Sequence, residues 1–402
     1  MVETSARRAP HVFIFEPRIE GHHLGYLKVI TEHLLDVGYR LTLAVDKTPE
    51  AYAVIRAEMS CGLERVSVVP AKDGPHGGGN LVKRIATLFE ESKADLVFLP
   101  NLDEIGSAML RGAALGLMPP MQLRGRLGGI YHRPRFLGAL GFSPNLRLKA
   151  AGFKRLLRGG WFSHLLLVDP YLQARLKARE PGAPAFFLPS FFPSDFSADG
   201  TAARRQFDLP ADKRIFLFYG TGNRRKGLGL TVRAMLAMSE AAPVFLLCAG
   251  RQAADREVGR GLERLEKQGR ARLINRYVSS DEEKQLFAAS DVVLLPYRKH
   301  FPISAVLVRA IGTGLPVIAS DEQLLGRLVR EHTLGILFRS GDARALQHAI
   351  ESAAQAPQEQ MARWQAAARA AAPNWTKQAF CGALDTSFNY AVSRLSTGLG
   401  AG

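Results

Sequence analysis

The chain has 402 residues, of which 47% are hydrophobic and 22% are charged, and its formal net charge is +16. A single hydrophobic core stops growing at roughly 250–300 residues, so two domains are expected, and this composition excludes a fibrous repeat or wholesale disorder. The positive charge favours a polyanionic partner such as membrane lipid, nucleic acid or a phosphorylated substrate, and composition does not choose among them.

The three cysteines and the hydrophobic runs indicate a cytoplasmic protein. Cys61, Cys248 and Cys381 lie far apart, with no second cysteine or histidine at the spacing of metal ligands. The apolar stretch 12–15 ends at Glu16, which is too short for the core of a signal peptide. No uninterrupted apolar run reaches the roughly 18–20 residues that span a bilayer. We therefore expect free thiols and neither a metal nor a cofactor.

Short apolar runs in the first half alternate with segments of helical periodicity. The predicted strands are 11–15, 40–45, 65–69, 94–100, 127–131 and 163–169. Between the first two, residues 26–37 place Leu27, Ile30, Leu34 and Leu35 on one helical face. Strands separated by helices imply βαβ units, and hence a parallel sheet covered on both faces.

The same alternation restarts after a polar stretch. Apolar periodicity lapses over about 193–213, and it returns with predicted strands at 214–219, 243–249, 271–275, 292–296, 316–319 and 335–338. The predicted layout is an N-terminal domain (1–195), a linker (196–212), a C-terminal domain (213–372) and a last helix (373–402) that packs back toward the first domain. The expected fold class is α/β, with two Rossmann-like, doubly wound parallel sheets.

Residues 219–227, Tyr-Gly-Thr-Gly-Asn-Arg-Arg-Lys-Gly, follow a predicted strand and open a helix. Glycines let the backbone approach a ligand, and a helix N-terminus with adjacent Arg and Lys side chains matches a diphosphate. A purely structural turn is the alternative, because such turns occur in any α/β sheet.

Residues 294–320 form the pattern strand, loop, helix, turn and strand. Ser304 is the expected N-cap, and the free amides that follow it point toward the carboxyl edge of the sheet, where ligands of open α/β folds bind. This predicts a second anion site, with a simple helix cap as the alternative.

Four features in order carry a resemblance to a known family. They are the glycine turn with Lys226-Gly227, the loop 277–279 before three acidic residues, the step from Ala289-Ser290-Asp291 to Leu295-Pro296, and Gly314-Leu315-Pro316-Val317. The series over about 214–350 resembles the donor-binding half of the family 4, or group 1, retaining glycosyltransferases. The resemblance implies a GT-B fold with two domains facing a central cleft, and transfer of a sugar from a nucleotide-diphosphate sugar with retention.

The resemblance also implies roles for individual residues. Lys226 and Arg225, with Gly220 and Gly222, would hold the diphosphate, although the Arg that follows the family's first glycine is Thr221 here. The base would lie on the loop at Tyr277 and Val278, largely against backbone. The phosphates and the sugar would meet the start of the next helix, at Ser304, Ala305 and Val306.

The chain departs from the family at its pair of glutamates. These lie eight positions apart, and the equivalent residues here are Phe301 and Arg309. Arg309 can hydrogen-bond ribose oxygens or a phosphate, but it cannot accept from hydroxyls as a carboxylate does. The departure leaves the identity of the nucleotide open. It also leaves two alternative functions: a catalytically silent binding subunit and a nucleotide-sugar epimerase of GT-B architecture.

We expect two loops in the first half of the chain to contact the acceptor. Residues 16–26 place Gly21, His22, His23 and Gly25 between a strand and a helix, as an acceptor and phosphate loop or, alternatively, as a capped turn. The family commonly places a histidine that contacts the transferred sugar at the end of a later strand, and His132 is the candidate. Asp103 and Glu104 are weaker candidates.

The segment between Glu104 and Asp169 contains ten basic and no acidic residues. Within it, Leu146, Ala150, Phe153 and Leu157 share a helical face, with Arg147, Lys154 and Arg158 beside them. This pattern is typical of a basic amphipathic helix on an anionic membrane. It predicts a peripheral protein on the inner face of the membrane, with a lipid-linked or cell-surface polysaccharide intermediate as the acceptor. The alternatives are a solvated helix over the core and nucleic-acid binding, which we do not expect because no nucleic-acid module accompanies the charge.

Overall fold

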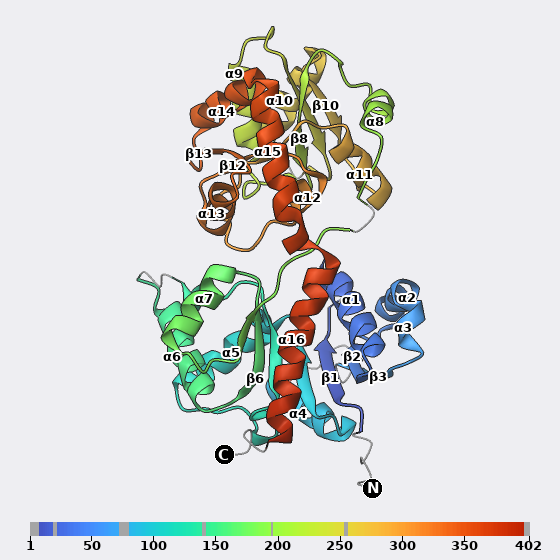
Figure 1. Ribbon diagram of the computed structural model, residues 1–402, viewed down its shortest axis with the longest axis vertical. Helices are drawn as coiled ribbons and strands as arrows, with labels where there is room; N and C mark the ends of the chain where they lie inside the picture. The colour runs from blue at the N-terminus through green and yellow to red at the C-terminus, as the bar shows by residue number, and fades with distance from the viewer. Residues whose placement is uncertain are drawn as a thin grey trace. The chain divides into compact units, whose positions relative to one another are not determined.

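The structure is a computed structural model that describes residues 8–18, 22–71, 80–138, 142–193, 196–252 and 256–397. The chain divides into two units, Met1–Leu188 with Cys381–Gly402, and Pro189–Phe380. Each unit is built on one parallel β-sheet with its own helices (Figure 1). No helix within the described ranges is long and apolar enough to cross a membrane.

The first unit contains a seven-stranded sheet in the order β3-β2-β1-β4-β5-β6-β7. Its strands are β1 (His11–Glu16), β2 (Arg40–Val45), β3 (Ser67–Pro70), β4 (Leu96–Leu99), β5 (Leu127–Tyr131), β6 (Phe162–Leu167) and β7 (Ala185–Phe187). Its helices are α1 (His22–Asp36), α2 (Pro49–Glu58), α3 (Ser60–Leu63), α4 (Leu81–Ser92), α5 (Leu102–Ala114), α6 (Pro144–Arg158) and α7 (Pro170–Arg179), with the 3₁₀ turns η1 (Met121–Leu123) and η2 (Arg135–Leu137). The winding reverses between β1 and β4, and the carboxyl ends of strands at such a point are where open α/β sheets bind ligands.

The last helix, α16 (Lys377–Ser396), belongs to the first unit from Cys381 onward. The ring of Phe388 lies 5.0 Å from that of Phe98 and 4.5 Å from that of His164, which are on β4 and β6. Asp385 pairs with Nε2 of His33 on α1 at 2.7 Å. This chain end therefore completes the core of the first unit.

The second unit contains a six-stranded sheet in the order β10-β9-β8-β11-β12-β13. Its strands are β8 (Arg214–Tyr219), β9 (Val244–Ala249), β10 (Ala271–Ile274), β11 (Val292–Leu295), β12 (Val317–Ser320) and β13 (Gly335–Phe338). Its helices are α8 (Gly200–Gln206), α9 (Leu228–Ala237), α10 (Arg256–Lys267), α11 (Ser280–Ala288), α12 (Ala305–Thr313), α13 (Gln323–Glu331), α14 (Ala343–Gln355) and α15 (Gln358–Ala371), and the 3₁₀ turn η3 (Ala372–Trp375) follows. Here the winding reverses between β8 and β11.

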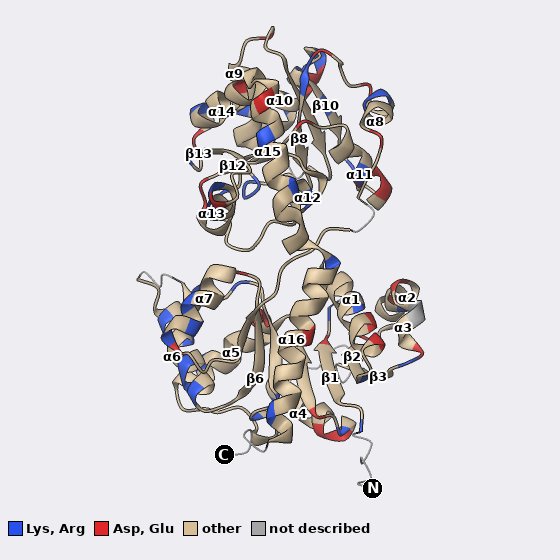
Figure 2. Cartoon of the chain, viewed as in Figure 1, with Lys and Arg blue, Asp and Glu red and all other residues tan. Residues whose placement is uncertain are grey.

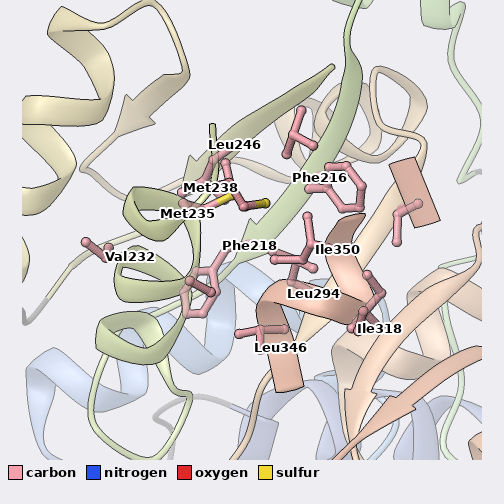
Figure 3. Packing of buried hydrophobic residues seen from close by; sticks show 14 of the residues in the cluster. Phe216, Phe218, Val232, Met235, Met238, Leu246, Leu294, Ile318, Leu346 and Ile350 are labelled. Atoms are coloured by element: carbon pink, nitrogen blue, oxygen red, sulfur yellow. The ribbon is translucent and has the colours of Figure 1, made fainter. Parts of the chain in front are cut away.

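The core of the second unit explains why its strands are almost wholly apolar. Phe216 and Phe218 on β8 pack with Met235 of α9 and Leu346 of α14, all at most 1% exposed (Figure 3). A parallel sheet is covered on both faces, so both sets of alternating side chains are buried.

The residues expected as a linker, 196–212, lie inside the second unit, and the division falls between Leu188 and Pro189. Asp199 caps α8, and Arg204 on that helix pairs with Asp291 at 2.7 Å. Ala203 is the buried residue that α8 contributes, so this short helix shows too little apolar periodicity to be predicted.

Candidate functional site

Two loops meet at the reversal point of the second sheet, one after β8 and one after β11. Gly220 and Gly227 in the first loop have φ angles of +98° and +78°, which favour glycine. A side chain at Gly220 would overlap the Lys226 ammonium group, and one at Gly227 would overlap the backbone of Pro296 in the second loop. The glycines therefore allow both the turn and the close approach of the loops.

Lys226 is the central cation of this site. Its Nζ donates to the carbonyl oxygen of Tyr219 at 3.2 Å and lies 5.7 Å from the centre of the Tyr297 ring. Burial lowers the pKa of Lys226 to about 8; the positive charges of Arg225 and Arg309 lower it further and Glu283 opposes them. An anion that binds here would relieve this repulsion.

Arg225 is oriented by a histidine in the second loop. Its Nη1 lies 2.8 Å from Nδ1 of His300, which must accept because a guanidinium only donates. The His300 ring lies 4.8 Å from that of Tyr297, and both side chains are buried. Sequence reasoning did not single out either of them.

Ser304 is the N-cap of α12, as expected. Its hydroxyl accepts from the amide of Leu307 at 3.2 Å and lies 3.4 Å from the Tyr297 hydroxyl, whose pKa burial raises to about 12. The cap leaves the amides of Ala305 and Val306, in the first turn of the helix, without intrahelical acceptors.

Arg309 is held by a buried carboxylate that the sequence did not identify as a site residue. Its Nε lies 2.6 Å from Oε1 of Glu283, which also accepts a hydrogen bond from the Tyr219 hydroxyl. Burial and the charge of Glu283 raise the pKa of Tyr219. Glu283 shares the buried face of α11 with Leu286 and Phe287, and this i, i+3, i+4 spacing was the available signal.

The two residues expected to hold the base differ in exposure. Tyr277 is 74% exposed, whereas Val278 is 8% exposed. The Tyr277 carbonyl accepts from Nη1 of Arg276 at 3.1 Å, and Arg276 is paired with Glu282. The Tyr277 side chain is therefore accessible, whereas Val278 is buried.

A second polar cluster lies at the reversal point of the first sheet. Glu16, at the end of β1, is buried with its Oε2 3.2 Å from Nδ1 of His23, and burial raises the pKa of Glu16. Asn101, after β4, approaches Nε2 of His23 to 3.4 Å. Of the predicted loop, Gly21 and the side chain of His22 lie outside the described residues, and Gly25 is in the first turns of α1 beside open space.

His132 follows β5 and joins this cluster. Its amide donates to Oδ2 of Asp103 at 2.5 Å, and its Nε2 lies 2.9 Å from the carbonyl oxygen of Pro100. Burial raises the pKa of Asp103 to about 6, although the amides of His132 and Arg133 oppose this. Glu104 is paired with Arg18 at 2.6 Å. The candidates from three loops thus converge.

The basic helix predicted for the first unit is α6, and part of its expected outward face is buried. Phe153 is 3% exposed, and its ring lies 5.2 Å from that of Phe136 and 5.7 Å from that of Phe162. Leu146, Ala150 and Leu157 are half-buried. The helix therefore covers the core, as in the alternative interpretation, while Arg147, Lys154, Arg155 and Arg158 are exposed. Figure 2 marks the basic residues along this helix in blue.

Several solved structures share this architecture. HepE from Anabaena in complex with UDP superposes with a TM-score of 0.70 at 17% identity, over 94% of this chain and 99% of that one. A glycosyltransferase from Rickettsia africae gives 0.69 at 12% identity, over 95% and 98%. Sucrose-phosphate synthase from Thermosynechococcus elongatus gives 0.63 at 17% identity, over 96% and 100%. None of the curated proteins compared matches the chain.

A family model matches the second unit of the chain. Residues 199–371 match the model of the glycosyl transferases group 1, and this range spans nearly all of the second unit. The two parallel α/β sheets match the architecture of the solved structures. The chain therefore has the GT-B fold, and residues 199–371 are similar to the glycosyl transferases group 1.

Proposed function

We propose that the protein transfers a sugar from a nucleoside-diphosphate sugar to an acceptor, and that the diphosphate binds beside Lys226. The observation that carries the proposal is the cation cluster at the reversal point of the second sheet, in which half-buried Lys226 and Arg309 lie with exposed Arg225. The UDP in the HepE complex supports a nucleotide as the ligand of this fold.

The cation cluster would act on the leaving group. When the bond from the sugar to the diphosphate breaks, negative charge accumulates on the diphosphate while the sugar becomes oxocarbenium-like. Lys226, Arg225 and the first amides of α12 stabilise that charge more in the transition state than in the bound donor, so they lower the barrier. The resemblance implies retention of configuration, which requires no strong catalytic base.

The donor differs from that of relatives in how its ribose is held. Phe301 and Arg309 occupy the positions of the family's two glutamates, so neither supplies a carboxylate acceptor. Arg309, oriented by Glu283, donates to a ribose oxygen or to a phosphate, while the Tyr277 ring and the backbone at Val278 contact the base.

The acceptor binds to the first unit, at the cluster of Glu16, His23, Asp103 and His132, with His132 beside the transferred sugar. The acceptor is a lipid-linked or cell-surface polysaccharide intermediate. An anionic membrane on the cytoplasmic side is the partner surface: Leu115, Leu117 and Met121 are 71%, 71% and 63% exposed, and the guanidinium of Arg155 lies beside Gly116. Exposed apolar side chains among cations match such a surface.

The test is a thermal-shift screen of nucleoside diphosphates, followed by transfer assays with the sugars of the base that binds. We expect one diphosphate to stabilise the protein and its sugar conjugates to support transfer or slow hydrolysis. A protein that no diphosphate stabilises would refute the donor site.

The rival is a catalytically silent binding subunit, which the absence of carboxylates at Phe301 and Arg309 favours. Such a protein would show the same rise in melting temperature on binding a nucleoside diphosphate. It would, however, neither transfer nor hydrolyse the sugar of any nucleotide sugar tested. The assays separate the two directly.

A further inference from the structure

A pocket on the first unit lies between α6, α7 and η2, and its lining includes none of the residues of the clusters at the strand ends. Its volume is about 360 Å³. This is within the range of small-molecule sites, which are roughly 300–1,000 Å³. The sugar-transfer proposal does not use this pocket.

The floor of the pocket is apolar. Phe136, Phe153 and Leu176 are at most 7% exposed and form its base, and Leu137, Ala150 and Leu157 line its walls. Ala150 and Leu157 are two of the residues expected on the outward face of α6, and they remain half-exposed because they border this space. Side chains of this kind accept hydrocarbon and offer sugars or bases little to hydrogen-bond.

The rim of the pocket is cationic. Lys154 and Arg158 come from α6, Arg175 and Arg179 come from α7, and Glu180 is the acidic residue of the lining. Glu180 pairs with Arg158 at 2.9 Å, so their charges offset each other. Lys154, Arg175 and Arg179 have no hydrogen-bond or ion-pair partner among the residues that the structure describes. Three uncompensated positive charges therefore line a pocket with an apolar floor.

We infer that this pocket binds the end of an anionic amphiphile, a lipid with a phosphate headgroup, with one hydrocarbon chain on the Phe153 floor and the phosphate at the Lys154–Arg179 rim. A water-soluble phosphate would leave the floor unused, and a neutral lipid would leave three cations without a partner. The occupant is thus defined by both parts of the lining.

The proposal is tested with dodecyl phosphate below its critical micelle concentration, titrated calorimetrically into the full-length protein. We expect one site per chain and no competition from inorganic phosphate. Ala150→Phe should weaken binding at least tenfold because the ring fills the pocket. Ala151→Phe is the matched control, since Ala151 is the exposed neighbour outside the lining, and it should bind normally.

The charge part of the inference has its own pair of variants. Lys154→Ala should weaken binding several-fold, whereas Lys177→Ala, the same loss of charge at an exposed residue of α7 outside the lining, should not. Leu157→Gln, which keeps a similar size, provides a second test of the apolar lining if Ala150→Phe does not fold.

Equal affinity of Ala150→Phe and Ala151→Phe, or of Lys154→Ala and Lys177→Ala, would overturn the pocket as the binding site. Dodecyl maltoside that binds as tightly as dodecyl phosphate would overturn the role of the rim, and inorganic phosphate that binds as tightly would overturn the role of the floor. These measurements use no nucleotide, so their failure leaves the sugar-transfer proposal standing, and the reverse also holds.

Discussion

Nε of Arg309 lies 2.6 Å from Oε1 of Glu283, whose side chain is 8% exposed. Glu283 opposes the effect of Arg225 and Arg309 on the pKa of Lys226, so this one buried carboxylate limits the repulsion within the cation cluster. We therefore regard Glu283 as a positioning residue that holds Arg309 and keeps Lys226 protonated.

We predict that Glu283→Gln lowers the free energy of unfolding by about 1–3 kcal/mol, because Arg309 loses the buried carboxylate with which it forms an ion pair. The pKa of Lys226 should also be lower in the variant. The loss of diphosphate affinity at alkaline pH should therefore begin at a lower pH than in the parent protein. Urea unfolding and diphosphate titrations over pH check the two effects. The double variant Glu283→Gln with Arg309→Met should recover part of the lost stability, and strictly additive losses would contradict the coupling.

Lys226→Ala should reduce kcat/KM for sugar transfer by about 10²–10³, the usual consequence of removing one group that stabilises transition-state charge. The circular dichroism spectrum should stay unchanged. Arg224→Ala removes an exposed charge from the same loop and serves as the control, with nearly normal activity expected. Equal effects of the two substitutions would argue against a specific role for Lys226.

The pKa of Lys226, lowered to about 8, predicts an alkaline limit for donor binding. The cationic form exists below that pKa, so diphosphate affinity should be full near pH 7 and fall about tenfold per pH unit above pH 8. Lys226→Arg keeps its charge throughout and should remove this fall. Calorimetric titrations from pH 6.5 to 9.5 measure the fall in diphosphate affinity. A constant affinity of the parent protein across this range would be inconsistent with Lys226 as the cation that binds the diphosphate.

The buried His164 should make the free energy of unfolding of the first unit depend on pH in the acid range. It is fully buried beside Phe98 and Phe388, and burial lowers its pKa from 6.5 to about 3. Between these values the unfolded chain binds a proton that the folded chain does not, so stability should fall as the pH drops, by up to about 1.4 kcal/mol per pH unit. His164→Phe should flatten this slope in urea unfolding between pH 4.5 and 7. His348→Gln, at an exposed site, should not change it.

Two glycines should respond in opposite directions to alanine. Gly227→Ala places a Cβ against the Pro296 backbone at a positive φ, so it should destabilise the second unit by about 1–3 kcal/mol. Gly259→Ala lies inside α10 with open space around it and should stabilise by about 0.5–1 kcal/mol. Thermal melts compare them, and a loss of stability in both would mean that the backbone argument fails.

Four strands, β2, β5, β8 and β13, have the bounds predicted from the sequence, because a strand buried on both faces is an apolar run that ends where polar turns begin. The edge strand β7 was not predicted. It has three residues, two of them half-buried, which is too short for any periodicity. The helix α8 was mistaken for part of a linker for the same reason.

The sequence by itself determined the alternation of strands and helices, hence the two parallel sheets, and it placed Lys226 and Ser304 on loops at strand ends. Only the tertiary structure decided which charges meet. Glu283 reaches Arg309 from another helix, 26 positions earlier in the chain, and Phe153 turns into the core rather than outward. Local sequence sets the face of an element on which a side chain lies, but which element that face meets depends on packing between distant segments.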